Sequence, residues 1–287
     1  MIRSEELLLI LATIVAIVTP LLILAAIYII PRDRLRILRT EFRSRSIAAL
    51  PFFLILGAVL AFNARYRMVL GRISEWIGFE ITHLIVRLEG QAVVHFHNFV
   101  GGEWAIIFFT FMYVYGYVFL LVFPLIAYYF MPDLDLLKAL TMAYTINYLV
   151  GSIFYTLFIA FGPRNRFPEL FGETMHTYYP QLSLLTTQVN EFTNVFPSLH
   201  TSLSATVMIF AWYSHSYYRR WTPIALFIGT CVIISTMYLA QHWVVDVIAG
   251  IALAAVSCWI GIQAVESDWL SSDRLANTWS RIARTDR

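Results

Sequence analysis

"PIALFIGTCVIISTMYLAQHWVVDVIAGIALAAVSCWIGIQAV", residues 223–265, is an almost uninterrupted apolar run, and it decides the fold. As a single α-helix it would be about 64 Å long, at about 1.5 Å per residue. That is about twice the thickness of the hydrocarbon core of a bilayer. The chain therefore has to turn back inside this run. We predict the turn near Ala240–His242, although no Gly or Pro marks it.

The whole chain has the composition of a membrane protein. Hydrophobic residues make up 59% of it and charged residues 13%, and the mean hydropathy is +0.70. A soluble globular protein of this composition would expose too much apolar surface. The first apolar run is too long for a signal-peptide core, so we expect it to stay in the mature protein. We predict seven membrane spans, at approximately 7–30, 47–63, 104–131, 139–161, 199–218, 223–241 and 242–265.

The positions of the arginines predict the orientation of these spans. Six of them, at 32, 34, 36, 39, 43 and 45, crowd the first loop, which the positive-inside rule places in the cytoplasm. If successive loops alternate between the two sides of the membrane, then Arg219, Arg220 and the arginines of the C-terminal tail also lie on the cytoplasmic side. The outer face then carries residues 64–103, the loop 162–197 and the turn before His242. Within it, "ITHLIVRLEGQAVVHFHNFVGG", residues 81–102, is typical of an interfacial or re-entrant segment that covers something.

A first polar cluster, "FPSLH" at residues 196–200, lies at the start of an apolar run. Pro197 cannot sit deep in a helix and Ser198 is a good N-cap, so we predict that the helix begins at about Leu199. Its free backbone N–H groups would attract an anion, and His200 in the first turn could exchange protons with it. The alternative is a polar helical turn whose histidine only meets water at the membrane surface.

A second cluster, "STMYLAQHWVVD", runs from Ser235 to Asp246. His242 and Asp246 are four residues apart, a spacing that predicts neighbouring positions on one helical face. The carboxylate would accept the Nδ1 proton of the imidazole and leave Nε2 free as a nucleophile. Ionisable residues inside a membrane are functional candidates by default. The alternative is a buried structural pair that joins two helices.

A third stretch, "FGPRNRFPE" at residues 161–169, adds two cations on the predicted outer face. The guanidinium groups of Arg164 and Arg166 suit phosphate oxygens, because they donate two parallel hydrogen bonds. Alternatively, both arginines only touch lipid headgroups. Two imidazoles, a carboxylate and a guanidinium on one face together fit phosphoryl transfer through a histidine. This chemistry requires no metal.

His95 and His97 are a separate pair, in "HFHNF". With Glu103 they offer ligand types that metals use. A bare H-x-H without two further ligands is a weak indication, so we expect neither a metal site nor a cofactor.

The first two clusters resemble the type 2 phosphatidic acid phosphatase superfamily. Pro197-Ser198-x-His200 is similar to its P-S-G-H signature, and Ser235-x6-His242-x3-Asp246 is similar to S-R-x5-H-x3-D. The resemblance implies an all-α integral membrane fold with a six-helix core plus one extra N-terminal transmembrane helix. It also implies catalytic roles for His242 as nucleophile, Asp246 as its orienting partner and His200 as the acid. Substrate contacts are expected from Ser198, Arg164, Arg166 and Ser235.

The chain departs from the superfamily pattern at three places. Thr236 stands where the pattern has Arg, Leu199 stands where it has Gly, and the lysine of the first signature, K-x6-R-P, is missing, since Leu157 or Ile159 holds that position. "FPSLH" and "STMYLxxHxxVD" resemble most the branch with the inositol phosphorylceramide synthases, which move a phospho-alcohol headgroup between lipids. A phosphate site with fewer cations suits a phosphodiester better than a phosphomonoester.

We therefore expect an integral-membrane lipid phosphatase or phosphotransferase that works through a phosphohistidine, with a membrane lipid as substrate and no nucleic acid as partner. Residues 1–46 would form the extra span and a basic cytoplasmic loop, 47–265 the catalytic membrane domain and 266–287 a cytoplasmic tail. The active site would face the extracytoplasmic or lumenal side, at the plasma membrane in a prokaryote. The alternatives are a phosphomonoester lipid phosphatase of the phosphatidate or polyprenyl diphosphate type, and a catalytically inactive lipid-binding scaffold.

Overall fold

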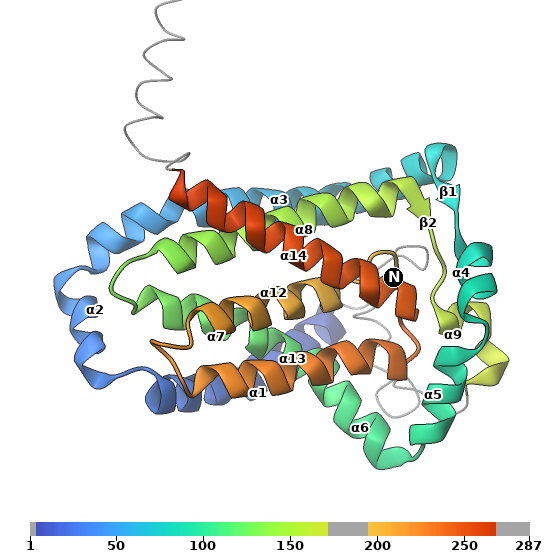
Figure 1. Ribbon diagram of the computed structural model, residues 1–287, viewed down its shortest axis with the longest axis horizontal. Coiled ribbons are helices and arrows are strands. Elements are labelled where there is room, and N and C mark those ends of the chain that lie inside the picture. Colours follow the sequence, from blue (N-terminus) through green and yellow to red (C-terminus); the bar gives the residue numbers. More distant parts are fainter. Residues whose placement is uncertain (1–3, 172–194, 268–287) are drawn as a thin grey trace, which may run out of the picture.

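A computed structural model of the chain describes residues 4–171 and 195–267 (Figure 1). The middle of the predicted outer loop and most of the predicted cytoplasmic tail lie outside the described residues. Six long helices are α1 (Ser4–Ile29), α3 (Phe42–Ile77), α8 (Asp135–Leu157), α12 (Leu199–Tyr213), α13 (Trp221–Tyr238) and α14 (Val244–Glu266). A seventh is continuous through α6 (Glu103–Phe111), the π-helical turn η2 (Met112–Gly116) and α7 (Tyr117–Tyr129).

Short elements connect these helices. They are η1 (Arg32–Arg36), α2 (Ile37–Thr40), α4 (Thr82–Glu89), α5 (Ala92–Val100), α9 (Pro163–Arg166) and η3 (Pro168–Leu170). Two strands of two residues each, β1 (Phe79–Glu80) and β2 (Phe158–Ile159), pair in parallel. The predicted helical fold is therefore confirmed, with this one short strand pair as an addition.

Five helical segments in the described part of the chain are long and apolar enough to cross a membrane. They are Leu8–Ile29, Phe42–Tyr66, Glu103–Tyr129, Trp221–Tyr238 and Val244–Glu266. The exceptions among the seven predicted spans are α8 and α12. Helix α12 has only 15 residues, fewer than the roughly 20 that a membrane span needs. Its polar side chains at Thr201, Ser202, Ser204 and Thr206 are also fully buried against protein. A helix enclosed by other helices does not need an apolar surface. A six-helix core with one added span stays a prediction.

Helix α3 differs from its prediction. The predicted span ended at Asn63, but the helix continues to Ile77 and is about 54 Å long. Arginines from Arg65 onward mark the end of the apolar stretch, and a helix does not have to end where the membrane ends. The candidate span within this helix, Phe42–Tyr66, ends close to the predicted Asn63, but the helix itself continues for a further 11 residues.

Arg45 is a second departure from the sequence interpretation. It was grouped with the arginines of the basic loop, yet it is buried near the start of α3. Its guanidinium donates to the carbonyl oxygens of Tyr129 (3.0 Å) and Pro132 (2.6 Å) and pairs with Glu41 (2.8 Å). The hydrogen bonds of this arginine therefore link the start of α3 to the turn between α7 and α8.

The turn between α13 and α14 confirms the predicted reversal. Ala240 has a φ of 55°, in the left-handed region. The N–H of Gln241 donates to the Thr236 carbonyl (3.0 Å) and the N–H of Ala240 to that of Met237 (2.9 Å). This is the Schellman pattern, in which a residue with positive φ ends the helix. Alanine fills the position that glycine usually takes, which is why no glycine marked the turn.

Figure 1 shows how the two ends of the bundle differ. Helices α4, α5 and α9 lie across one end, where α12 and α14 begin. Helix α2 lies at the opposite end. Both predicted histidine clusters therefore fall at the same end of the bundle.

A close crossing of α12 and α14 gives a stability prediction. A Cβ atom at Gly250 would lie 2.6 Å from the Ser198 carbonyl oxygen, whereas a Cβ at Gly57 would meet nothing within 4 Å. We expect Gly250→Ala to destabilise the protein by about 1–3 kcal/mol, because the backbones have to separate. Thermal unfolding in detergent measures this, with Gly57→Ala as the control. Equal melting temperatures for the two variants would contradict the close packing.

Candidate active site

The start of α12 is tied to the start of α14. Ser198 caps α12, and its Oγ accepts from the N–H of Thr201 at 3.3 Å. Its own N–H donates to the carbonyl oxygen of Asp246 at 3.1 Å. The prediction that a helix begins at Leu199 behind a serine cap is confirmed. Ser198 itself is fully buried beneath this helix end.

His200 lies in the first turn of α12 between two aromatic rings. The ring centroids of Tyr113 and Tyr117 are each 4.3 Å from that of the imidazole, at interplanar angles of 15° and 34°. Both tyrosines belong to the region where the α6–α7 helix is π-helical, a local widening that often occurs at functional sites. Sequence reasoning missed them, because in an aromatic-rich chain they look like ordinary membrane packing. The two rings fix the plane of the imidazole.

His242 lies in the turn before α14 and is buried. Its Nδ1 is 2.9 Å from the carbonyl oxygen of Val195. A carbonyl oxygen only accepts, so a neutral imidazole here carries its proton on Nδ1. Nε2 then keeps its lone pair and is the nitrogen that is free to accept a proton or to form a bond. The His200 and His242 side chains are close enough to interact electrostatically.

The predicted geometry of the His242–Asp246 pair needs a correction. Helix α14 begins at Val244, so His242 lies outside it and the two side chains do not share a helical face. Nδ1 of His242 is 3.5 Å from Oδ2 of Asp246, farther than from the Val195 carbonyl. Oδ2 also accepts from the N–H of Trp243 at 2.8 Å. Asp246 therefore caps the helix as well as facing the imidazole, and Val195 holds the tautomer.

Of the two predicted phosphate-binding arginines, Arg164 is half-buried at the end of the bundle that carries His200 and His242. Its backbone N–H donates to the Ala240 carbonyl at 3.1 Å, and Gly162 packs against the carbonyl of Gln241. Within the described part of the chain, the buried Nη1 atom of Arg164 has no hydrogen-bond partner. Burial lowers the pKa of this guanidinium, and the nearby Tyr113 acts in the opposite direction. A buried cation with an unsatisfied N–H group is a natural contact for an anion.

Arg166 and Ser235, the other two residues predicted to contact the substrate with Ser198 and Arg164, have different surroundings. Arg166 is exposed, with its guanidinium carbon 5.2 Å from the centroid of the Phe167 ring. Ser235 is fully buried on α13, and its hydroxyl donates to the Val232 carbonyl at 2.6 Å. The next residue, Thr236, is also buried and donates to Ile233. Neither Arg166 nor Ser235 joins the cluster of His200, His242, Asp246 and Arg164.

His97, half of the weak H-x-H pair, has a different partner. Its Nδ1 donates to the carbonyl oxygen of Tyr238 at 2.8 Å, whereas His95 is exposed. No group of three His, Cys, Asp or Glu side chains that could hold a metal ion occurs within residues 4–171 and 195–267.

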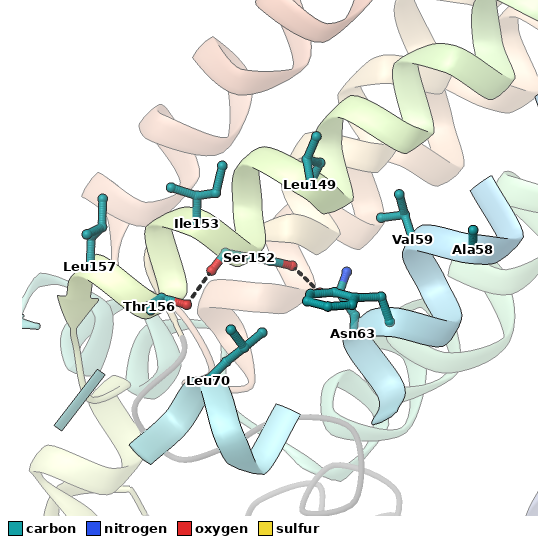
Figure 2. Close-up of a pocket in the computed structure, with 10 residues that line it drawn as sticks. Ala58, Val59, Asn63, Leu70, Leu149, Ser152, Ile153, Thr156 and Leu157 are labelled. Atoms are coloured by element: carbon teal, nitrogen blue, oxygen red, sulfur yellow. Dashed lines mark hydrogen bonds between the residues drawn. The ribbon is translucent and has the colours of Figure 1, made fainter. Parts of the chain in front are cut away.

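An apolar groove runs between α3 and α8 (Figure 2). Its volume is about 640 Å³, and its polar lining consists of Asn63, Ser152 and Thr156. The Ser152 hydroxyl on α8 donates to Oδ1 of Asn63 on α3 at 2.6 Å, so these two polar side chains satisfy each other across the groove. None of the lining residues is titratable, and none belongs to the cluster of His200, His242, Asp246 and Arg164.

Comparison with known proteins identifies the family. Residues 70–260, about two thirds of the chain, match the PAP2 superfamily, and the chain belongs to it. The matched region contains every residue of the cluster, and α1 precedes it. Neither a curated protein nor a solved structure was found to match the chain. Membership supports a lipid phosphatase type of function for this membrane protein.

Proposed function

We propose that the chain is a lipid phosphotransferase that moves a phospho-alcohol headgroup between lipids through a phosphohistidine on His242. The observation that carries the proposal is the hydrogen bond from His242 Nδ1 to the Val195 carbonyl, because it leaves Nε2 as the free nucleophile. The buried Nη1 of Arg164, which has no partner in the described residues, supports a phosphate contact at the same end of the bundle.

The proposed reaction has two steps. In the first, the Nε2 lone pair of His242 attacks phosphorus, the bond to the leaving oxygen breaks, and His200 gives that oxygen a proton. In the second, a hydroxyl of the acceptor attacks phosphorus, the P–N bond breaks, and His200 takes the hydroxyl proton. Arg164 and the N-terminal turn of α12 stabilise the charge on the remaining phosphate oxygens. Asp246 supports the imidazolium-like charge that forms on His242.

The preference for a phosphodiester follows from the cations around the cluster. Thr236, where the superfamily pattern has an arginine, is buried and hydrogen-bonded to its own helix. Lys138, the chain's single lysine, lies on α8 near the start of that helix and contacts the Phe52 ring at 5.9 Å. One half-buried guanidinium matches the single charge of a diester better than the nearly double charge of a monoester. This supports the headgroup-transferase branch suggested by "FPSLH".

Incubation with labelled lipids tests this proposal. The purified protein would be given a phosphodiester lipid or the corresponding phosphomonoester, each with and without a lipid alcohol, and the products scored as free phosphate or new phospholipid. We expect new phospholipid from the diester, dependent on the alcohol. Preferential release of phosphate from the monoester would contradict the transferase and indicate a phosphatase. Lipid binding without either product would indicate an inactive scaffold.

A further inference from the structure

Helices α4 and α5 contact the turn that carries His242. They lie across the same end of the bundle as the start of α14 (Figure 1). Their buried side chains Ile85, Val93 and Val94 pack in one apolar cluster with Ala240 and Trp243, which flank the histidine. This packing brings polar groups of α4 and α5 to the end of α13 and to the start of α14.

Glu89, the last residue of α4, binds the first turn of α14. One carboxylate oxygen accepts from the N–H of Val244 at 2.9 Å, and the other accepts from the N–H of Val245 at 2.5 Å. The first N–H groups of a helix have no partner within it, and a negative charge at this end is favourable. Asp246 already satisfies the N–H of Trp243. The two carboxylates together therefore hold three consecutive N–H groups directly after His242.

His97 on α5 binds the other side of the turn. Its Nδ1–H donates to the carbonyl of Tyr238, the last residue of α13, at 2.8 Å. Its ring centroid is 5.1 Å from that of Tyr238 and 5.4 Å from that of Phe171. A histidine at a helix C-terminus satisfies one of the last carbonyls, which otherwise lack a partner.

We propose that Glu89 is a positioning residue for His242, acting through the backbone of α14, and that His97 on α5 supports the same turn through its hydrogen bond to the end of α13. This inference rests on the proposed function, in which Nε2 of His242 has to meet phosphorus in line with the leaving oxygen. Glu89 fixes where α14 begins, and the start of α14 fixes both Asp246 and the backbone at His242. A displacement of about 1 Å at a reacting atom is enough to slow a reaction by about 100-fold.

Substitution of Glu89 tests the inference with two readouts. We expect Glu89→Ala to lower kcat by about 10-fold to about 100-fold while KM changes by less than about threefold. Glu89→Gln keeps one carbonyl acceptor and should fall between Glu89→Ala and the wild type. Glu103→Ala removes an exposed carboxylate from the start of α6 and should match the wild type.

Hydrogen exchange of the peptide that covers residues 239–247 is the second readout. We expect faster exchange at Val244 and Val245 in Glu89→Ala, with unchanged exchange in α7 and α8. Unchanged kcat in both Glu89 variants would overturn the inference, even if exchange became faster, because the contact would then be structural only. If Glu89→Ala does not fold, Glu89→Gln decides by the same measurements. Full activity of a His242 variant would instead remove the proposed function, and the exchange data would still report on the contact.

Discussion

Replacing His242 with asparagine is expected to lower turnover by at least about 10³-fold. The loss of a nucleophile that forms a covalent intermediate has effects of this size or larger. Asparagine is the informative substitution, because its amide N–H can still donate to the Val195 carbonyl that His242 Nδ1 contacts at 2.9 Å. The variant therefore keeps the local hydrogen bond and removes only Nε2. Steady-state turnover of the labelled lipid measures the effect.

His95→Asn is the matched control for this experiment, because His95 is exposed on α5 and lies outside the cluster. It should keep wild-type turnover. If His242→Asn retained more than about a tenth of wild-type activity, His242 would not be the nucleophile.

Replacing His200 with asparagine is expected to slow the reaction by about 10²-fold to 10⁴-fold on a lipid substrate, the usual range for the loss of a general acid. The effect should depend on the leaving group. A lipid alkoxide needs a proton in order to leave, whereas nitrophenolate does not. With a nitrophenyl phosphodiester we therefore expect a loss of less than about 10-fold in the first step, measured as the initial burst of nitrophenol.

The position of His200 between Tyr113 and Tyr117 supports this role, because the two rings fix the direction in which the imidazole presents its N–H. Equal losses with both leaving groups would show that His200 binds the phosphate rather than protonates the leaving oxygen. His95→Asn again provides the comparison.

Local rules predicted the features of the site that depend on a few neighbouring residues. The helix start at Leu199 followed from Pro197 and Ser198, and the structure has that cap. The reversal near Ala240 followed from the length of the apolar run compared with the membrane. The placement of both histidines at one end of the bundle then followed from counting spans.

Contacts between a side chain and a backbone group far away in the sequence could not be predicted in this way. The partner of His242 Nδ1 is a backbone carbonyl 47 residues earlier. Every residue has a backbone carbonyl, so the sequence does not indicate which one is the partner. The spacing of His242 and Asp246 suggested a helical pair, but the helix begins between them, so local turn geometry replaced the expected contact. The role of Glu89 could not be predicted either, because its partners are backbone N–H groups 155 and 156 residues away.

The positions of the two predicted arginines show the same limit. Arg164 and Arg166 are two residues apart in a short helix, and sequence alone gave them the same role. Helix α9 places Arg164 in a half-buried position near Tyr113, whereas the guanidinium of Arg166 is exposed and lies over the Phe167 ring. The contact of Gly162 and Arg164 with the turn at Ala240 and Gln241 positions Arg164 in this way, and this contact cannot be read from the sequence.

Trapping the phosphoenzyme is the most direct test of the account. The protein would be mixed with a lipid labelled in its phosphate, quenched within one turnover in base, in which a phosphohistidine survives, and digested for mapping. The account predicts label on Nε2 of His242, lost in acid and absent from His242→Asn. Label on any other residue, or rapid turnover with no labelled protein at any time, would contradict it.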